Sequence, residues 1–191
     1  MNIDTGLSIW QGKLIRLRAT EPSDWETFFA WDQDVEQSRR LYFIPFPQSQ
    51  ERTRHFVEKI STQRPEDDGW CFEIEDKAGE LVGNLTTNQC DRRVGNFRYG
   101  IAIKQGHRGK GYASEAILLV LRYYFQELRY QKVTISVYSF NEASIRLHEK
   151  LGFLQEGCIR RTVFTRGQYY DELVYGMTVE EFASKHPEFA P

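Results

Sequence analysis

The feature that most constrains this chain is a cationic, glycine-rich turn in residues 101–116, between an apolar strand end and an amphipathic run. After the turn, apolar residues recur at three- and four-residue spacing, which predicts one stripe of a helix of about four to five turns. The stripe consists of Ala113, Ala116, Ile117, Val120, Leu121, Tyr124, Phe125 and Leu128. The strand, the turn and the helix therefore form one unit.

Such a junction is suited to binding an anion. A helix begins with unpaired backbone N–H groups and a partial positive charge, so an anion binds there when the backbone can approach closely. Gly106, Gly109 and Gly111 leave the turn without side chains, and Arg108 and Lys110 add positive charge. The pattern predicts a phosphate-binding loop.

Two common phosphate loops do not fit these residues. The P-loop requires a glycine where Lys104 stands and a serine or threonine where Gly111 stands. The dinucleotide fingerprint requires a third glycine where Ser114 follows Gly109 and Gly111. A nucleoside triphosphate and a dinucleotide are therefore disfavoured as ligands.

Residues 108–113, Arg-Gly-Lys-Gly-Tyr-Ala, resemble the signature by which GCN5-related N-acetyltransferases (GNAT) hold the pyrophosphate of acetyl-CoA. Residues 141–153 resemble the following helix of that family, which an asparagine opens and a Gly-Phe pair ends. Both segments stand in the family's order and spacing. The alternative is an amphipathic helix after an ordinary loop.

The resemblance implies a set of contacts with acetyl-CoA. It places the backbone of Ile101, Ala102 and Ile103 beside the thioester and pantetheine, and Asn141 against the pantetheine arm. It places the loop around the pyrophosphate, and the loop residues are Arg108, Gly109, Lys110, Gly111, Tyr112 and Ala113.

The residues that would move protons depart from the family's common pattern. Where many relatives carry a tyrosine, four residues before the Gly-Phe pair, this chain has His148. An imidazolium with a pKa near roughly 6.5 can protonate a leaving thiolate, although a histidine on a helix face is often inert. Ser144 is the second candidate acid, with capping of the helix start as its alternative role.

A general base is harder to identify. Glu73 and Glu75 share one face of a predicted strand, and either can take a proton from the acceptor amine through water. A solvated strand face explains the two carboxylates equally well. No pair of histidines has metal-ligand spacing, so we expect no metal.

Composition limits the remaining possibilities. The chain has 191 residues, 40% of them apolar, and a net charge of −2, so we expect one domain over residues 1–191 that binds neither nucleic acid nor a membrane. Cys71, Cys90 and Cys158 are scattered, which favours a reduced, cytoplasmic setting. No stretch reads as a targeting or membrane-spanning segment.

The order of elements gives the expected fold class. We expect an α/β (α+β) fold like that of the GNAT family, with a mixed, twisted, mostly antiparallel sheet of about seven strands flanked by helices. The expected strands cover residues 13–19, 70–75, 81–89, 94–103, 133–138, 158–163 and 169–177. The expected helices follow residues 21–24, Ser49, Gly111, Asn141 and Thr178, with a loose lead-in at 1–11 and a fraying tail at 187–191.

An aromatic segment broken by prolines separates the first two helices. In the resembling family this region covers the acceptor site, so Tyr42, Phe43 and Phe46 either line a substrate pocket or cover the core.

The resemblance to the GNAT family implies an enzyme that transfers the acetyl group of acetyl-CoA to a primary amine by direct attack in a ternary complex. In the carboxy-terminal hairpin, a set of five residues resembles the RimJ/RimL branch: Gly157, Arg160, Gly167, Tyr170 and Asp171. This resemblance implies a protein amino terminus as acceptor. The alternatives are a small amine (polyamine, amino acid or aminoglycoside) or a catalytically silent acyl-CoA-binding module. Exposed strand edges would permit a homodimer.

Overall fold

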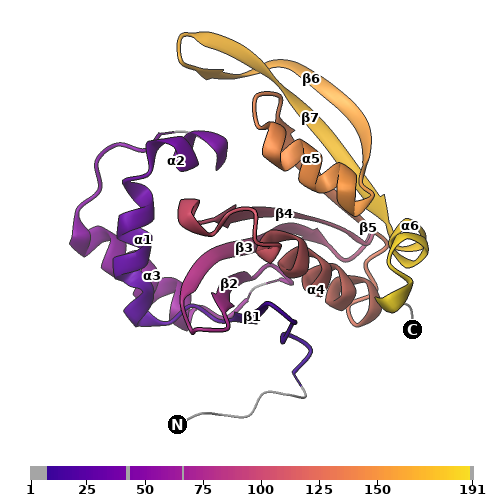
Figure 1. The fold of residues 1–191 in the computed structure, drawn as a ribbon, viewed down its shortest axis with the longest axis horizontal. Helices are drawn as coiled ribbons and strands as arrows, with labels where there is room; N and C mark the ends of the chain where they lie inside the picture. Colours follow the sequence, from indigo (N-terminus) through magenta and orange to yellow (C-terminus); the bar gives the residue numbers. More distant parts are fainter. Residues whose placement is uncertain (1–7, 42–43, 66, 190–191) are drawn as a thin grey trace. The chain divides into compact units, whose positions relative to one another are not determined.

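The computed structural model describes residues 8–41, 44–65 and 67–189, and Figure 1 traces them. In this part of the chain seven strands form one sheet in the order β1-β2-β3-β4-β5-β7-β6. Strands β4 and β5 pair in parallel, whereas the β1–β2, β2–β3, β5–β7 and β6–β7 pairs are antiparallel, which confirms the mixed, mostly antiparallel sheet. The chain divides into two compact units, Met1–Thr86 with Ile101–Val120, and Thr87–Gly100 with Leu121–Pro191.

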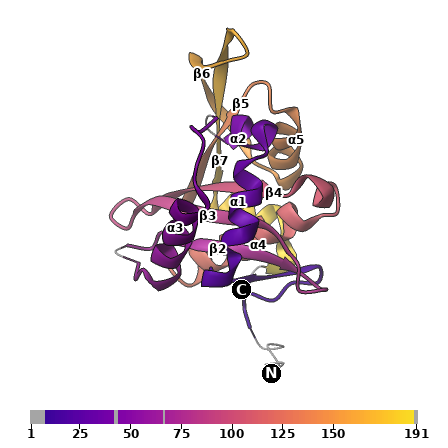
Figure 2. The same ribbon diagram turned by 90° about the vertical axis from the view of Figure 1, so that its left-hand side faces the viewer.

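The first unit contains the amino-terminal strands and helices. Their bounds are β1 Ile15–Arg18, α1 Trp25–Asp32, α2 Val35–Leu41, α3 Gln50–Thr62 and β2 Cys71–Asp76, followed by the start of β3 Leu81–Asp91, the end of β4 Asn96–Ile103 and the first half of α4 Tyr112–Gln126. Helices α1 and α3 lie side by side (Figures 1 and 2), with the Phe28 and Phe56 rings 6.5 Å apart. Ser49 caps α3 by accepting the Arg52 N–H, as predicted.

Helix α2 was missed because its sequence carries no apolar stripe; its only buried residue is Gln37. The aromatic segment that follows is only partly described, and Tyr42 and Phe43 lie outside the described residues. Phe46 is 89% exposed, so the prediction that it covers the core is wrong. That Phe46 lines a substrate pocket stays a prediction.

Strand β2 is buried on both faces. Phe72 and Ile74 are buried on one side, as the alternation predicted, and Glu73 and Glu75 are buried on the other. The alternative of a solvated carboxylate face is therefore wrong. Alternation shows which residues share a face but does not show what covers that face.

The second unit contains the carboxy-terminal half of the sheet. Its elements are the remainder of β3, β4 and α4, then β5 Lys132–Tyr138, α5 Glu142–Leu151, β6 Leu154–Thr165, β7 Gln168–Thr178 and α6 Val179–Lys185. Phe97 of β4 stacks on Tyr124 of α4 with ring centroids 4.3 Å apart, and both side chains are buried. This aromatic contact lies in the core of the unit.

Helix α5 begins and ends as the sequence predicts. Asn141 accepts the Ser144 N–H at the helix start, and Gly152 ends the helix with a left-handed φ of +98°. The same helix runs along β7 in Figure 1, and the Tyr175 hydroxyl donates to Glu149 Oε1 at 3.3 Å.

The carboxy-terminal hairpin and tail are more ordered than expected. Strands β6 and β7 extend beyond the predicted ranges and meet at a turn where Arg166 and Gly167 have positive φ. Pro187–Phe189 forms a 3₁₀ turn, and the Phe189 ring lies 6.1 Å from that of Phe182. The prediction that the tail frays from residue 187 is therefore wrong for these three residues.

Candidate functional site

The predicted phosphate loop connects the end of β4 to the start of α4 through a 3₁₀ turn at Gln105–His107. Gly109 and Gly111 have φ of +77° and +88°, a region that other residues rarely adopt. Gly106 has no positive φ and no atom within 4 Å of where a β-carbon would lie. Two of the three glycines are therefore required by the backbone of the loop.

Arg108 supports the loop from within. Its Nε donates to the Ile103 carbonyl at 3.0 Å, and its Nη2 donates to Oε1 of the buried Gln37 at 3.2 Å. Burial lowers the pKa of the guanidinium. These bonds join the loop to the end of β4 and to helix α2, an interaction that the sequence did not reveal.

The strand before the loop is held close to its neighbour. A β-carbon on Gly83 would lie 2.3 Å from the Ala102 carbonyl oxygen, so only glycine permits this approach. The Lys104 N–H donates to the Val82 carbonyl at 2.8 Å. Ile101, Ala102 and Ile103, the predicted thioester-binding segment, thus form the fixed end of β4.

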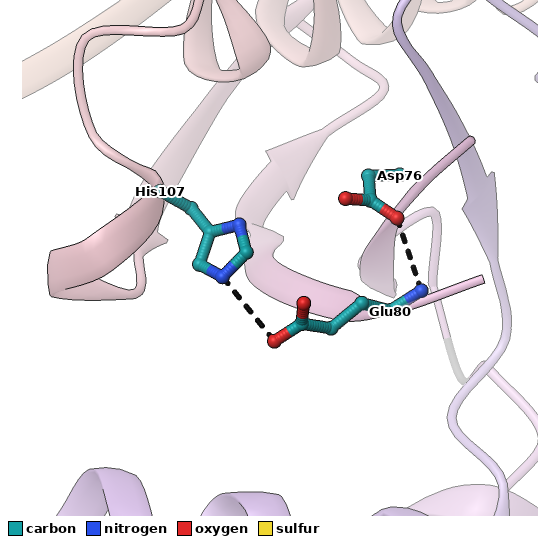
Figure 3. A group of neighbouring side chains, drawn as sticks. All are labelled: Asp76, Glu80 and His107. Atoms are coloured by element: carbon teal, nitrogen blue, oxygen red, sulfur yellow. Dashed lines mark hydrogen bonds and ion pairs between the residues drawn. The ribbon is translucent and has the colours of Figure 1, made fainter. Parts of the chain in front are cut away.

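A cluster of His107, Glu80 and Asp76 lies beside the loop (Figure 3). One donor atom from each residue lies within 4.8 Å of the others, so a grouping of possible metal ligands exists that sequence spacing did not indicate. Glu80 Oε1 accepts Lys104 Nζ at 2.8 Å and pairs with His107 Nε2 at 3.2 Å, and Asp76 Oδ1 accepts the Glu80 N–H. Because a lysine already neutralises Glu80, we interpret the cluster as a tie between the loop and the β2–β3 turn.

Glu73 is the most deeply buried carboxylate of the described chain, with no exposed surface. Its Oε1 accepts the Thr20 hydroxyl at 2.7 Å and lies 3.5 Å from Cys71 Sγ. Within the described residues its Oε2 has no hydrogen-bond partner. Burial raises the pKa of Glu73 to about 7, so it can hold or release a proton near neutral pH.

Glu75, the other candidate base, has a different environment. Burial alone would raise its pKa, but hydrogen bonds from Arg16 at 2.7 Å and Arg18 at 2.8 Å outweigh that effect, and the pKa is lowered. Arg18 also forms a bidentate pair with Asp24, with both distances 2.8 Å. A carboxylate in this ion-pair network is a weak base, so the geometry favours Glu73.

His148 is 2% exposed, and both of its ring nitrogens are engaged. Nδ1 lies 2.8 Å from the Ser144 carbonyl oxygen, which can only accept, so Nδ1 carries the proton. Nε2 then accepts the Tyr99 hydroxyl at 2.9 Å. Burial lowers the pKa of His148 to about 4, so the expected imidazolium with a pKa near 6.5 is wrong and the ring is neutral at pH 7.

Ser144 and Asn141 lie at the amino terminus of the same helix. Ser144 Oγ is 3.3 Å from His148 Nδ1, and Asn141 accepts the Ser144 N–H at 3.4 Å. Asn141, Ser144 and His148 are thus linked by contacts at the start of α5. Tyr99 was missed, because its place on β4 gives no sign of a partner that is 49 residues away.

No helix among the described residues combines the length and apolarity needed to cross a membrane.

The family described as "Acetyltransferase (GNAT) domain" matches residues 15–154. The SPbeta prophage-derived uncharacterized N-acetyltransferase YokL of Bacillus subtilis is 43% identical over 94% of this chain and 98% of its own length. Spermidine N(1)-acetyltransferase of Escherichia coli is 25% identical over 90% of each chain. The structure of spermidine N-acetyltransferase from Vibrio cholerae in complex with CoA and spermine superposes with a TM-score of 0.79 at 22% identity, covering 90% of this chain and 99% of that one. This chain belongs to the GNAT family of acetyltransferases.

Proposed function

We propose that the protein transfers the acetyl group of acetyl-CoA to a primary amine. The observation that carries this proposal is the glycine loop at the start of α4, where Gly109 and Gly111 adopt left-handed conformations. Backbone N–H groups at such a helix start favour a pyrophosphate. A structural neighbour that was solved with CoA supports the choice of cofactor.

The residues assigned to acetyl-CoA follow the family signature. We propose that Gly109, Lys110, Gly111, Tyr112 and Ala113 bind the pyrophosphate through their backbone. Arg108 contributes charge and braces the loop through Ile103 and Gln37. The backbone of Ile101, Ala102 and Ile103 binds pantetheine, and Asn141 contributes to the pantetheine arm.

For the proton of the attacking amine, we propose Glu73 with Thr20 as relay. The Thr20 hydroxyl donates to Glu73 Oε1, so it can take the amine proton while it passes its own to the carboxylate. A Glu73 pKa of about 7 allows the carboxylate to accept this proton near neutral pH and to release it afterwards.

For the leaving thiolate, we propose Ser144 as the hydrogen-bond donor and His148 as the residue that positions it. Since His148 is neutral and donates its only ring proton to Ser144, it does not act as an imidazolium acid. The Ser144 hydroxyl is the remaining donor, and His148 orients it. Ser144→Ala should lower kcat while acetyl-CoA affinity is kept.

Two classes of acceptor are supported by different observations. The hairpin of β6 and β7 resembles the RimJ/RimL branch, which implies a protein amino terminus. The E. coli relative named spermidine N(1)-acetyltransferase matches 90% of the chain and favours a polyamine. A cytoplasmic setting, a homodimer and a single domain over residues 1–191 stay predictions.

The test is thiol release from acetyl-CoA in the presence of peptides, polyamines, amino acids and aminoglycosides. Release that depends on one amine class would support the enzyme and identify its acceptor. Binding of acetyl-CoA without release for any amine would instead support a silent acyl-CoA-binding module.

A further inference from the structure

Glu115, in the first turn of α4, binds a segment 100 residues earlier in the chain. Its carboxylate accepts three consecutive backbone N–H groups, from Lys13 at 2.7 Å, Leu14 at 2.7 Å and Ile15 at 2.9 Å. Hydrogen bonds to an ionised acceptor are the strong ones in proteins. Glu115 thus fixes the backbone that leads into β1.

Gly12 permits this close approach. A β-carbon at Gly12 would lie 2.5 Å from Cδ and Oε2 of Glu115, which no side chain could accommodate without movement. The turn is closed by the Gly12 N–H, which donates to the Ile15 carbonyl at 2.8 Å, and by Lys77 Nζ, which donates to the Gly12 carbonyl at 2.9 Å. The segment from Gly12 to Ile15 is therefore held at several points.

This arrangement also places Leu14 against the phosphate loop. Leu14 Cδ1 lies so close to Gly111 that a β-carbon added to the glycine would be 3.1 Å from it. Leu14 is also 42% exposed, so part of its side chain faces solvent beside the last glycine of the loop. The segment that Glu115 holds thus packs against Gly111 through Leu14.

We propose that Glu115 is a positioning residue for acetyl-CoA: by holding residues 12–15, it keeps Leu14 against Gly111 and so fixes the shape of the phosphate loop. This inference rests on the proposed function, because it assumes that the loop binds the pyrophosphate of acetyl-CoA. The three N–H donors also partly compensate the negative charge that Glu115 places in the first turn of the anion-binding helix.

The direction in which Glu115→Gln changes the affinity for acetyl-CoA distinguishes a positioning role from a purely electrostatic one. Glu115→Gln removes a negative charge near the loop, which by itself would leave binding of an anionic ligand unchanged or tighten it. The substitution also presents an amide N–H₂ where an oxygen accepted backbone N–H groups, so residues 12–15 lose part of their anchor. Positioning therefore predicts weaker binding, against the electrostatic trend.

The experiment compares acetyl-CoA affinity and steady-state kinetics of the full chain with those of its variants. We expect Glu115→Gln to raise the Kd and KM for acetyl-CoA about tenfold while kcat changes by less than about twofold. Leu14→Ala, a change at an exposed side chain, should raise both constants by a similar factor. Because both changes act through one contact, the double variant should be no weaker than the weaker single variant.

Glu51→Gln is the matched control, because Glu51 also lies in the first turn of a helix but in α3. It should leave all constants unchanged. Amide hydrogen exchange at residues 13–15 should speed up in Glu115→Gln and not in the control. If wild type binds acetyl-CoA and both Glu115→Gln and Leu14→Ala bind it equally well, the inference is overturned and the proposed function stands. If wild type itself binds no acetyl-CoA, the proposed function fails.

Discussion

At the scale of single residues, Glu73 shows how environment decides chemistry. It and Glu75 are two positions apart on β2 and both are buried. Two arginines hold Glu75 ionised, whereas Glu73 has a hydroxyl and a thiol near one oxygen and, in the part of the chain that the structure describes, no partner on the other. The neutral form of Glu73 is therefore favoured, and burial raises the pKa of its neighbour Cys71 to about 11 as well.

The raised pKa of Glu73 predicts how the free energy of unfolding depends on pH. The pKa of Glu73 is about 7 in the folded chain and near 4.5 when unfolded. The contribution of Glu73 to the free energy of unfolding is therefore fully present below pH 4.5 and is lost as pH rises through 7. Glu73→Gln, which stays neutral, should be more stable than wild type at pH 8 by about 3 kcal/mol. The two proteins should be closely similar at pH 4.5.

Denaturant unfolding at several pH values measures this difference. Glu75→Gln is the control, and it should be less stable than wild type at pH 8, because Arg16 and Arg18 lose their charged partner. Equal pH dependence of wild type and Glu73→Gln would show that Glu73 titrates normally and would remove the argument for it as a base.

At the scale of elements, the ends of helix α5 were the most predictable part. Asn141 and Gly152 have local physical reasons to stand where they do, since one caps backbone N–H groups and the other adopts positive φ. The turn between β6 and β7 lies between the two expected strand ranges, and Arg166 and Gly167 adopt positive φ there. Helix α2 could not be predicted in this way, because its contact through Gln37 depends on Arg108, which is 71 residues away.

Gly152 gives a prediction at this scale. Gly152→Ala should lower the free energy of unfolding by about 1 kcal/mol or more, because φ of +98° strains alanine and a β-carbon would lie 2.9 Å from Lys185 Cγ. Gly100→Ala is the matched control, with no positive φ and nothing within 4 Å, and it should not be destabilising. Thermal unfolding of wild type and the two variants measures these differences. Equal stability of wild type and Gly152→Ala would contradict the role of Gly152 as the cap of α5.

At the scale of the whole molecule, the sequence was sufficient for the number of strands and for the family. Strand alternation, the glycine loop and the Asn and Gly-Phe signals are local patterns, and each of the seven expected strand ranges overlaps one strand of the sheet. The states of Glu73 and His148 were not predictable, because they depend on burial and on Thr20 and Tyr99, which are distant in the chain. Local patterns give elements, whereas protonation depends on what packs around a side chain.

The central claim is that the loop at the start of α4 binds acetyl-CoA. Gly109 and Gly167 offer a matched pair, since both have φ of +77° and neither has an atom within 4 Å of an added β-carbon. Gly109→Glu and Gly167→Glu therefore add the same side chain with the same backbone strain, but only the first places a negative charge in the loop.

The measurement is a calorimetric titration of acetyl-CoA into wild type and these two variants, each folded by circular dichroism. We predict that wild type and Gly167→Glu bind with equal affinity and that Gly109→Glu loses binding by at least about a hundredfold, because a carboxylate then opposes the pyrophosphate in the loop. Equal affinity of all three proteins, or no binding by wild type, would contradict the account.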